Sequence, residues 1–285
     1  MRRVGAEAAR APEPRALLDV RDEASFAAGH LAGSGHVPHA EFRERRAELP
    51  PREQAVLVIS DDPCQSAAAA ADLEAMGYAD VAALDVPLAR LPDGHADRGP
   101  AARLWSPAPF LLEVIPRVRP PGAARPGPAA DLAAGSGREA VFLALHGFQV
   151  EAWDRAPEAL ERAVALARRN GVEIRTEVAD LERGNRALPA ARYALIVVFR
   201  FLHRPLFPAI ERALAPGGWL VYETYRVGQE RFGRPKNRRF LLEPRELLSA
   251  FPGLSIDRYE EPEPPGGPIT ARLLAFKPGA PETSS

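Results

Sequence analysis

Short apolar stretches alternate with stretches of helical periodicity in the first part of the chain. Three apolar runs predict strands, at residues 16–20, 55–60 and 81–86. Two stretches that lie between them predict helices, at residues 23–30 and 66–76. A glycine stands where each helix should stop, Gly29 in the first and Gly77 in the second. Strands that alternate with helices in this way predict a small α/β domain.

The same alternation continues on a larger scale in the second part of the chain. Five further strands are predicted, at residues 129–133, 148–153, 172–180, 193–201 and 217–225. Four helices are predicted to accompany them, at residues 138–146, 156–170, 205–214 and 243–251. The uninterrupted apolar run at 193–201 is typical of a strand at the centre of a parallel sheet. The last two stretches, 254–261 and 270–278, predict an antiparallel pair that closes the sheet.

A proline-dense stretch separates the two series of elements. It extends from residue 92 to residue 128, and within it residues 109–115 are apolar enough to predict one short helix. We therefore place a domain boundary near residue 100. The expected organisation has four segments: a small domain at 1–95, a linker with a short helix at 96–128, a larger domain at 129–277 and a flexible tail at 278–285. The first 14 residues are expected to be loose.

Composition narrows the classes of function. The chain has 285 residues, of which 46% are hydrophobic, and its net charge is −1. Such a charge gives no reason to expect nucleic-acid binding, and no apolar run is long enough to cross a bilayer. The single cysteine excludes an internal disulfide framework, and the first residues lack the apolar core of a secretory signal. We expect a cytoplasmic protein that does not associate with membranes.

A glycine-containing turn follows the first predicted strand of the larger domain. Gly135, Gly137 and Ala140 satisfy the pattern G-x-G-x-x-A, and Asp154 follows at the end of the next predicted strand. A dinucleotide site would use both features, so an NAD-dependent oxidoreductase is one hypothesis. A tight turn that serves only the fold is the alternative without a ligand.

An acidic residue before this turn favours a different ligand. Asp131 would repel a pyrophosphate at short range, whereas it would attract a cofactor that carries an ammonium and a sulfonium group. S-adenosylmethionine is such a cofactor. Asp154 can accept hydrogen bonds from both ribose hydroxyls, and Asp180 can accept the proton of the adenine amino group. All three acids stand at carboxyl ends of predicted strands, where open α/β sheets bind their ligands.

Residues 102–277 resemble the class I S-adenosylmethionine-dependent methyltransferases. Five motifs match in order, at residues 131–138, 150–154, 178–181, 194–207 and 214–225. The resemblance implies a Rossmann-like domain with a seven-stranded, mostly parallel sheet. It places the cofactor on Asp131, Ala133, Gly135, Gly137, Asp154, Asp180, Leu181 and Phe199. Ala133 departs from the pattern, since the family often has glycine there, and its methyl group narrows the approach of the cofactor.

A narrower resemblance concerns the acceptor of the methyl group. Residues 221–251 are similar to the tellurite-resistance and thiopurine-type branch, which methylates small soft nucleophiles. This implies a small-molecule acceptor, a thiol or another chalcogen compound.

Candidates for the acceptor side follow the fourth and fifth strands of the larger domain. They are Arg200, His203, Glu223 and Tyr225. His203 can take a proton or cap a helix, Arg200 can bind an anionic acceptor or form an ion pair, and Glu223 can orient a partner or lie on the surface. Residues 231–240 form either a lid over the acceptor or a solvated loop.

Residues 17–39 resemble the rhodanese-like domain, and the resemblance extends over residues 12–95. Six residues occupy its structural signature: Asp19, Arg21, Phe26, Gly29, His30 and Gly33. Active members of the family have a cysteine directly after a strand, where this chain has Ser60. Asp61 and Asp62 would repel thiosulfate, and Gln65 replaces an arginine that helps to bind the anion. We therefore expect a domain without sulfurtransferase activity.

Two features of this domain leave alternatives open. Cys64 lies near a predicted helix start, so it is either a displaced sulfur carrier or, as we favour, a small and partly buried packing residue. His30, His36 and His39 suggest a metal site, but His30 and His36 fit structural positions of the family, and we expect no metal. The domain is expected to support the methyltransferase or to bind a protein partner. If both domains were degenerate, the chain would be a non-enzymatic sensor or scaffold.

Overall fold

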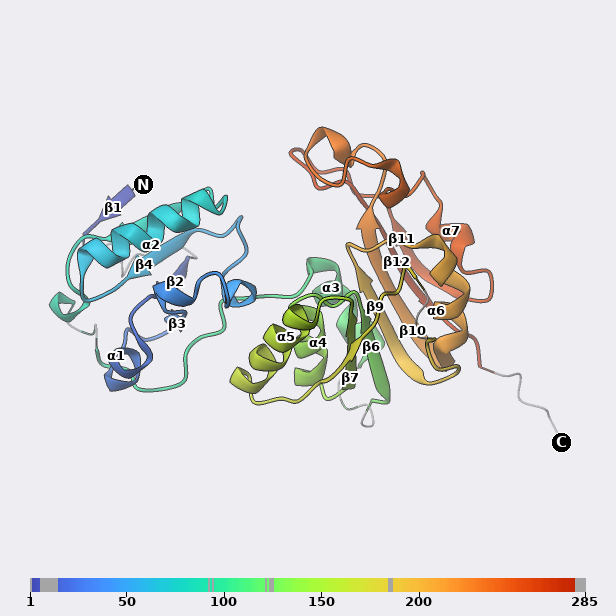
Figure 1. Cartoon of the computed structure of the whole chain (residues 1–285), viewed down its shortest axis with the longest axis horizontal. Coiled ribbons are helices and arrows are strands. Elements are labelled where there is room, and N and C mark those ends of the chain that lie inside the picture. The colour runs from blue at the N-terminus through green and yellow to red at the C-terminus, as the bar shows by residue number, and fades with distance from the viewer. Residues whose placement is uncertain are drawn as a thin grey trace. The chain divides into compact units, whose positions relative to one another are not determined.

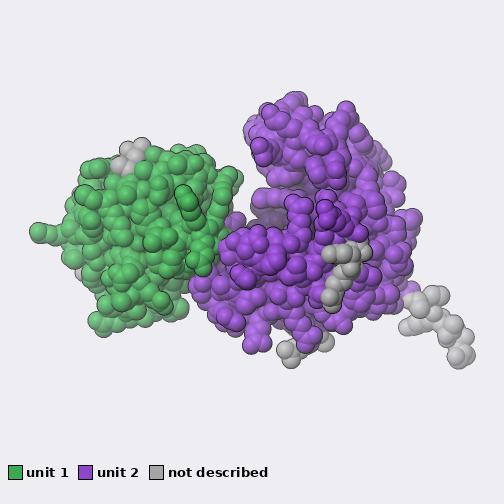
Figure 2. Space-filling view, in the orientation of Figure 1, with its two compact units in different colours: residues 1–106 green, residues 107–285 purple. Residues whose placement is uncertain are grey.

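The computed structural model of the chain divides into two compact units, residues 1–106 and 107–285 (Figure 1, Figure 2). It describes residues 2–5, 15–91, 93, 95–120, 122, 126–183 and 187–279. In this part of the chain, no helix has the length and apolar character needed to span a membrane. Most of the tail that was expected to be flexible, residues 280–285, lies outside the described residues.

Unit 1 is built on a five-stranded parallel sheet. Its strands are β1 (Arg2–Val4), β2 (Ala16–Asp19), β3 (Gly35–His36), β4 (Val56–Ile59) and β5 (Val81–Leu84), in the spatial order β1-β5-β4-β2-β3. Apolar side chains of β4 alternate between two cores, since Val58 joins the cluster on one face and Leu57 joins the cluster on the other. Helix α2 (Pro63–Ala75) covers the first of these faces with Ala69, Ala70 and Leu73.

Two short strands of unit 1, β1 and β3, were not predicted from the sequence. The first residues were expected to be loose, but β1 pairs with β5 in parallel register, which is a correction. The stretch has two arginines in three residues and shows no alternation of apolar and polar side chains, so no pattern indicates it. The two-residue β3 is too short for any periodicity. Residues 6–14, also expected to be loose, lie outside the described residues.

Unit 2 contains a seven-stranded mixed sheet. Its strands are β6 (Pro128–Leu132), β7 (Gln149–Asp154), β8 (Arg175–Val178), β9 (Tyr193–Phe199), β10 (Leu214–Tyr225), β11 (Ser255–Glu260) and β12 (Thr270–Phe276). Their spatial order is β11-β12-β10-β9-β6-β7-β8, and β12 runs antiparallel to both of its neighbours. The other pairs are parallel. The predicted α/β fold with a seven-stranded, mostly parallel sheet is confirmed.

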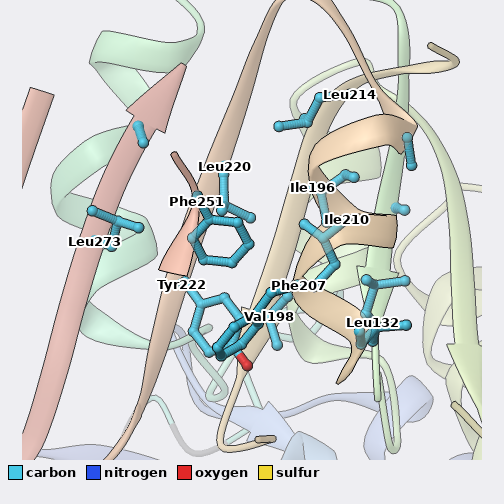
Figure 3. Packing of buried hydrophobic residues seen from close by; sticks show 14 of the residues in the cluster. Leu132, Ile196, Val198, Phe207, Ile210, Leu214, Leu220, Tyr222, Phe251 and Leu273 are labelled. Carbon is cyan, nitrogen blue, oxygen red and sulfur yellow. The ribbon is translucent and has the colours of Figure 1, made fainter. Parts of the chain in front are cut away.

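Helices cover both faces of this sheet (Figure 1). One face carries α3 (Pro109–Val118), α4 (Arg138–Leu145) and α5 (Pro157–Arg169), and the other carries α6 (Phe207–Ala213) and α7 (Leu247–Ala250). Under α6 and α7 lies the main apolar core (Figure 3), in which the Phe207 ring centre lies 5.0 Å from that of Phe251 and 6.0 Å from that of Tyr222. The Tyr222 hydroxyl leaves this core and donates to the carbonyl oxygen of Phe201, 2.9 Å away.

The helices predicted at 243–251 and at 109–115 have other bounds in the structure. The helix predicted at 243–251 shrinks to the single turn α7, because Pro244 and the left-handed Arg245 (φ 63°) interrupt its start. The helix predicted at 109–115 is longer and continues through Pro116 to Val118. It belongs to unit 2 and not to a separate linker.

Candidate functional site

The glycine turn lies at the carboxyl end of β6, between that strand and α4. Gly135 (φ 53°) and Gly137 (φ 78°) both adopt the left-handed conformation that favours glycine. A Cβ atom at Gly137 would lie 2.5 Å from the Cβ atom of Ala163, so this glycine lets α5 pack closely. A Cβ atom at Gly135 would meet nothing within 4 Å, so the backbone here has an open side. Gly137 therefore allows close helix packing, whereas Gly135 leaves space beside the backbone.

Ala133 shares the unusual backbone of the glycines without being one. Its φ is 61°, which costs a residue with a Cβ atom about 1 kcal/mol. Strain of this kind persists only where the surroundings fix it, and it gathers at functional sites. The turn thus keeps the glycine-type geometry at a position where the sequence departs from the family pattern.

Asp154 ends β7 and is tied to the glycine turn. Its Oδ2 accepts the backbone N–H of Gly135 at 2.8 Å, and its Oδ1 accepts that of Ala156 at 2.9 Å. Each carboxylate oxygen can accept a second hydrogen bond, so the half-buried side chain retains capacity for a ligand. The structure thus places Asp154 next to the glycine turn, as the sequence predicts. The contact of Asp154 with a ribose stays a prediction.

Asp180 and Leu181 lie in the turn that follows β8. This turn is held beside Asp154, because the N–H of Ala179 donates to the Asp154 carbonyl oxygen at 2.9 Å. The Asp180 carboxylate is half-buried and accepts the N–H of Glu182 at 3.0 Å, whereas Leu181 is buried. Both predicted cofactor residues therefore stand at the same edge of the sheet as the glycine turn.

Asp131 occupies a different position from the other two acids. Its side chain is only 2% exposed, and its Oδ2 has no hydrogen-bond partner among the described residues. Burial, and next the nearby charge of Glu139, raise the pKa of Asp131 well above the usual value for aspartate. Asp131 thus differs from Asp154 and Asp180, whose side chains are only partly buried.

Arg200 follows β9 directly, at the carboxyl edge of the sheet. Its φ is 56°, a strained value for arginine, and its N–H donates to the carbonyl oxygen of Glu223 at 2.8 Å. The side chain is exposed, and its guanidinium forms no ion pair with any described residue. The ion-pair alternative for Arg200 thus finds no partner in the described part of the chain. Phe199, the last residue of β9, is half-buried and pairs with Glu223 of β10.

Glu223 is buried and already bound by neighbours from β12. Its carboxylate accepts hydrogen bonds from Arg272 Nε and Thr270 Oγ1, both at 3.0 Å. Arg272 also lies 3.7 Å from Glu113 of α3, so the group links the sheet to that helix. The alternative that Glu223 is a surface carboxylate is wrong, because the side chain is only 8% exposed.

His203 and Tyr225 complete the acceptor-side candidates. His203 is half-buried and precedes the 3-10 turn η5 (Arg204–Leu206), but its side chain makes no capping hydrogen bond, so the capping alternative is wrong. Tyr225 ends β10, is half-buried and lies on the same face of the strand as Glu223, as the alternation of side chains predicts. Neither ring forms a hydrogen bond with another described residue.

Two segments, residues 226–246 and 261–268, form a lobe that rises beyond the end of β10 (Figure 1). Arg204 fixes part of it, since its guanidinium donates to the carbonyl oxygens of Arg239 at 3.0 Å and Leu241 at 2.9 Å and pairs with Glu246. Figure 2 shows unit 2 hollowed below this lobe, on the side of the strands' carboxyl ends. Within the predicted lid, residues 231–240, the end nearest Arg239 is therefore anchored.

A cavity of about 560 Å³ lies elsewhere in unit 2. It is lined by the ends of α3 and α4, including Ile115, Arg119 and His146. Because His146 lies just before the start of β7, the cavity is near the amino ends of the strands. It is therefore separate from the edge that carries Asp154 and Asp180.

In unit 1, the loop that holds a thiolate in active rhodaneses holds a hydroxyl group. Ser60 Oγ donates to Gln65 Oε1, and the Gln65 amide donates to the Val20 carbonyl oxygen at 3.4 Å. Next to it, Asp61 pairs with Arg21 at 2.8 Å and lies 2.9 Å from His95. The polar groups of the loop thus satisfy one another.

The expectation that Cys64 is a partly buried packing residue is wrong. Cys64 is exposed and not partly buried, because it occupies the first turn of α2 on the side away from the alanines that face the core. Its N–H donates to the Asp62 carboxylate at 2.9 Å, so an acidic side chain already caps this helix.

The histidines of unit 1 make packing and polar contacts. The Phe26 ring stacks between His30 and His36, with centroid distances of 3.8 and 4.4 Å. His39 instead reaches Asp72, at 2.8 Å. Among the described residues, no group of three or more His, Cys, Asp or Glu side chains suits a metal ion.

Sequence reasoning missed two residues that shape the site. Glu139, in the first turn of α4, accepts the N–H of Ala108 at 3.0 Å and lies near Asp131. An acidic residue in the first turn of a helix after a glycine turn is a usable signal. Arg204, which anchors the lobe, had no such signal, because its partners lie 35 to 42 residues away along the chain.

Comparisons with known proteins agree with this architecture. The model of the rhodanese-like domain matches residues 5–86, and that of a methyltransferase domain matches residues 129–218. No curated protein matches the chain.

Solved structures of similar fold include TehB from Haemophilus influenzae, at 18% identity and a TM-score of 0.48, over 59% of this chain and 61% of that chain. A second is an S-adenosylmethionine-dependent methyltransferase from Mesorhizobium loti, at 22% identity and a TM-score of 0.45, over 57% of this chain and 97% of that chain. The match thus spans about three fifths of TehB. On the two family matches, the chain joins a rhodanese-like domain to a methyltransferase domain.

Proposed function

We propose that the protein methylates a small molecule at a thiol or another chalcogen atom, with S-adenosylmethionine as its cofactor. The observation that carries the proposal is the glycine turn and its bond to Asp154 at the carboxyl edge of the parallel strands. The open side of Gly135 and the free acceptor capacity of Asp154 fit a ribose and its attached groups.

Residues around the turn would hold the cofactor in distinct ways. Asp154 would accept the ribose hydroxyls, and Asp180 would accept the adenine amino proton, while Leu181 and Phe199 would flank them. When bound, S-adenosylmethionine supplies a methyl group whose bond to sulfur breaks as the bond to the acceptor forms, and the bonding electrons stay on that sulfur. The task of the chain is then to align the acceptor and to exclude water.

The acceptor would lie near the ends of β9 and β10. There Arg200 and Tyr225 present side chains that bind no other described residue, and His203 can take a proton from a thiol. Glu223 would act as a positioning residue. Its backbone carbonyl accepts the N–H of the strained Arg200, and its carboxylate is already hydrogen-bonded to Arg272 of β12.

The rhodanese-like domain would take no catalytic part in sulfur transfer. Ser60 cannot carry a persulfide, and its hydroxyl is bound to Gln65 within the loop. The domain would instead support the methyltransferase or recognise a protein partner.

The proposal is tested by offering the full chain S-adenosylmethionine together with thiols, selenite, tellurite or small phenols, and measuring S-adenosylhomocysteine. We expect turnover with at least one thiol or chalcogen compound, and much weaker turnover for Asp154→Asn. Turnover with phenols alone would overturn the acceptor class. Absence of both turnover and cofactor binding would overturn methyl transfer and leave a scaffold.

A further inference from the structure

Asp131 is a buried acid without a compensating cation. Its side chain is 2% exposed, and its Oδ2 has no hydrogen-bond partner among the described residues. No arginine, lysine or histidine of the described residues forms an ion pair with it. An ionised carboxylate in such a place is unfavourable, because neither solvent nor a neighbour stabilises the charge.

The elements packed around Asp131 add further negative charge. The negative charges of Glu139 on α4 and Asp154 on β7 both act against ionisation of Asp131, whereas the backbone N–H of Ala140 favours it. On β9 its register partner is the apolar Val197. From α5, Arg162 donates to the Ser136 hydroxyl at 3.4 Å and forms no ion pair with Asp131. Burial and two like charges together raise the pKa of Asp131 well above its usual value.

We propose that Asp131 holds a proton while no cofactor is bound and releases it to the solvent when the cationic cofactor binds. This inference rests on the proposed function, because it needs a ligand with positive charge at the turn. The ammonium and sulfonium groups stabilise the carboxylate that the empty site disfavours. One proton leaves the carboxyl group for the buffer, and no other bond changes.

The coupling makes cofactor affinity depend on pH in a defined direction. Below the pKa of Asp131 in the free protein, the proton must be removed before the carboxylate can pair with the cation. The dissociation constant therefore falls by about tenfold per unit as pH rises through this range. Above that pKa the carboxylate is already ionised, and the dependence disappears.

Calorimetry of the full chain tests this directly. S-adenosylmethionine is titrated at several pH values, each time in two buffers that both buffer at that pH and whose ionisation enthalpies differ. We expect a buffer-dependent heat that corresponds to about one released proton at acidic pH and to none at alkaline pH. Binding without any proton release across this range overturns the inference but leaves the proposed function intact. Absence of binding overturns both.

Three variants locate the proton. Asp131→Asn should bind S-adenosylmethionine without proton release, and its affinity should fall relative to wild type mainly at alkaline pH. Glu139→Gln removes one like charge and should move the release to lower pH, which gives a readout if Asp131→Asn does not fold. Asp180→Asn is the control, since it should weaken binding but keep the released proton. Release that persists in a folded Asp131→Asn variant contradicts the assignment.

Discussion

At the scale of single residues, neighbouring positions of the glycine turn have separate physical reasons for their identity. Gly137 is required by the contact with Ala163 of α5, whereas Gly135 has open space on the side where a Cβ atom would point. The sequence pattern G-x-G-x-x-A predicts the turn but cannot say which glycine serves packing and which serves a ligand.

This difference predicts that two alanine substitutions lower stability by different amounts. Gly137→Ala should lower the free energy of unfolding by about 2–4 kcal/mol, from backbone strain and overpacking against Ala163. Gly135→Ala should lower the free energy of unfolding by about 1 kcal/mol, from backbone strain alone. It should also weaken S-adenosylmethionine binding. Denaturant unfolding and calorimetry measure the two quantities. Equal losses of stability would contradict the assigned packing role of Gly137.

Cys64 should not accept sulfur from thiosulfate. The thiol is exposed, but the acidic side chains of Asp61 and Asp62 stand at the helix start and oppose an approaching anion. We expect that incubation of the protein with thiosulfate leaves Cys64 unmodified in intact mass spectra, with Cys64→Ser as the baseline. A persulfide on wild type that is missing from Cys64→Ser would support sulfur transfer instead.

At the scale of elements, the carboxyl edge of the sheet depends on contacts distant in sequence. The strands and most helices follow from local periodicity, so their ranges are largely predictable. The anchoring of the lobe depends on Arg204, which binds two carbonyl groups and Glu246 from a segment far along the chain. Such contacts leave no periodic signal. For the same reason, the sequence pattern predicted neither the burial of Asp131 nor the hydrogen bonds from β12 to Glu223.

The anchor predicts a pH-dependent contribution to local stability. Burial alone would raise the pKa of Glu246. The hydrogen bonds from Arg204 and from the backbone N–H of Glu243, together with the charge of Arg204, outweigh burial and hold that pKa below its usual value. The pair therefore stabilises the lobe above the ordinary glutamate pKa, about 4.3, and its contribution is lost as pH falls through the lower folded value.

Arg204→Met should thus increase amide exchange in residues 238–246 at neutral pH, by loss of hydrogen bonds worth about 1–3 kcal/mol. Hydrogen exchange with peptide resolution measures this, and Arg245→Met, one position before the end of the segment, is a control on charge. Unchanged protection of the segment in Arg204→Met would contradict the anchoring role.

At the scale of the whole molecule, the chain combines an α/β unit that retains the form of a rhodanese-like domain with a methyltransferase domain. In the second unit, we expect the acidic carboxyl edge of the sheet to favour a cationic nucleotide-like cofactor over a diphosphate.

Calorimetric titration of the full chain with S-adenosylmethionine and, separately, with NADH tests that claim most directly. We predict that S-adenosylmethionine binds at one site, that NADH does not bind, and that Asp154→Asn weakens the binding by about tenfold or more through loss of a charged hydrogen-bond acceptor. Binding of NADH without binding of S-adenosylmethionine would contradict the account.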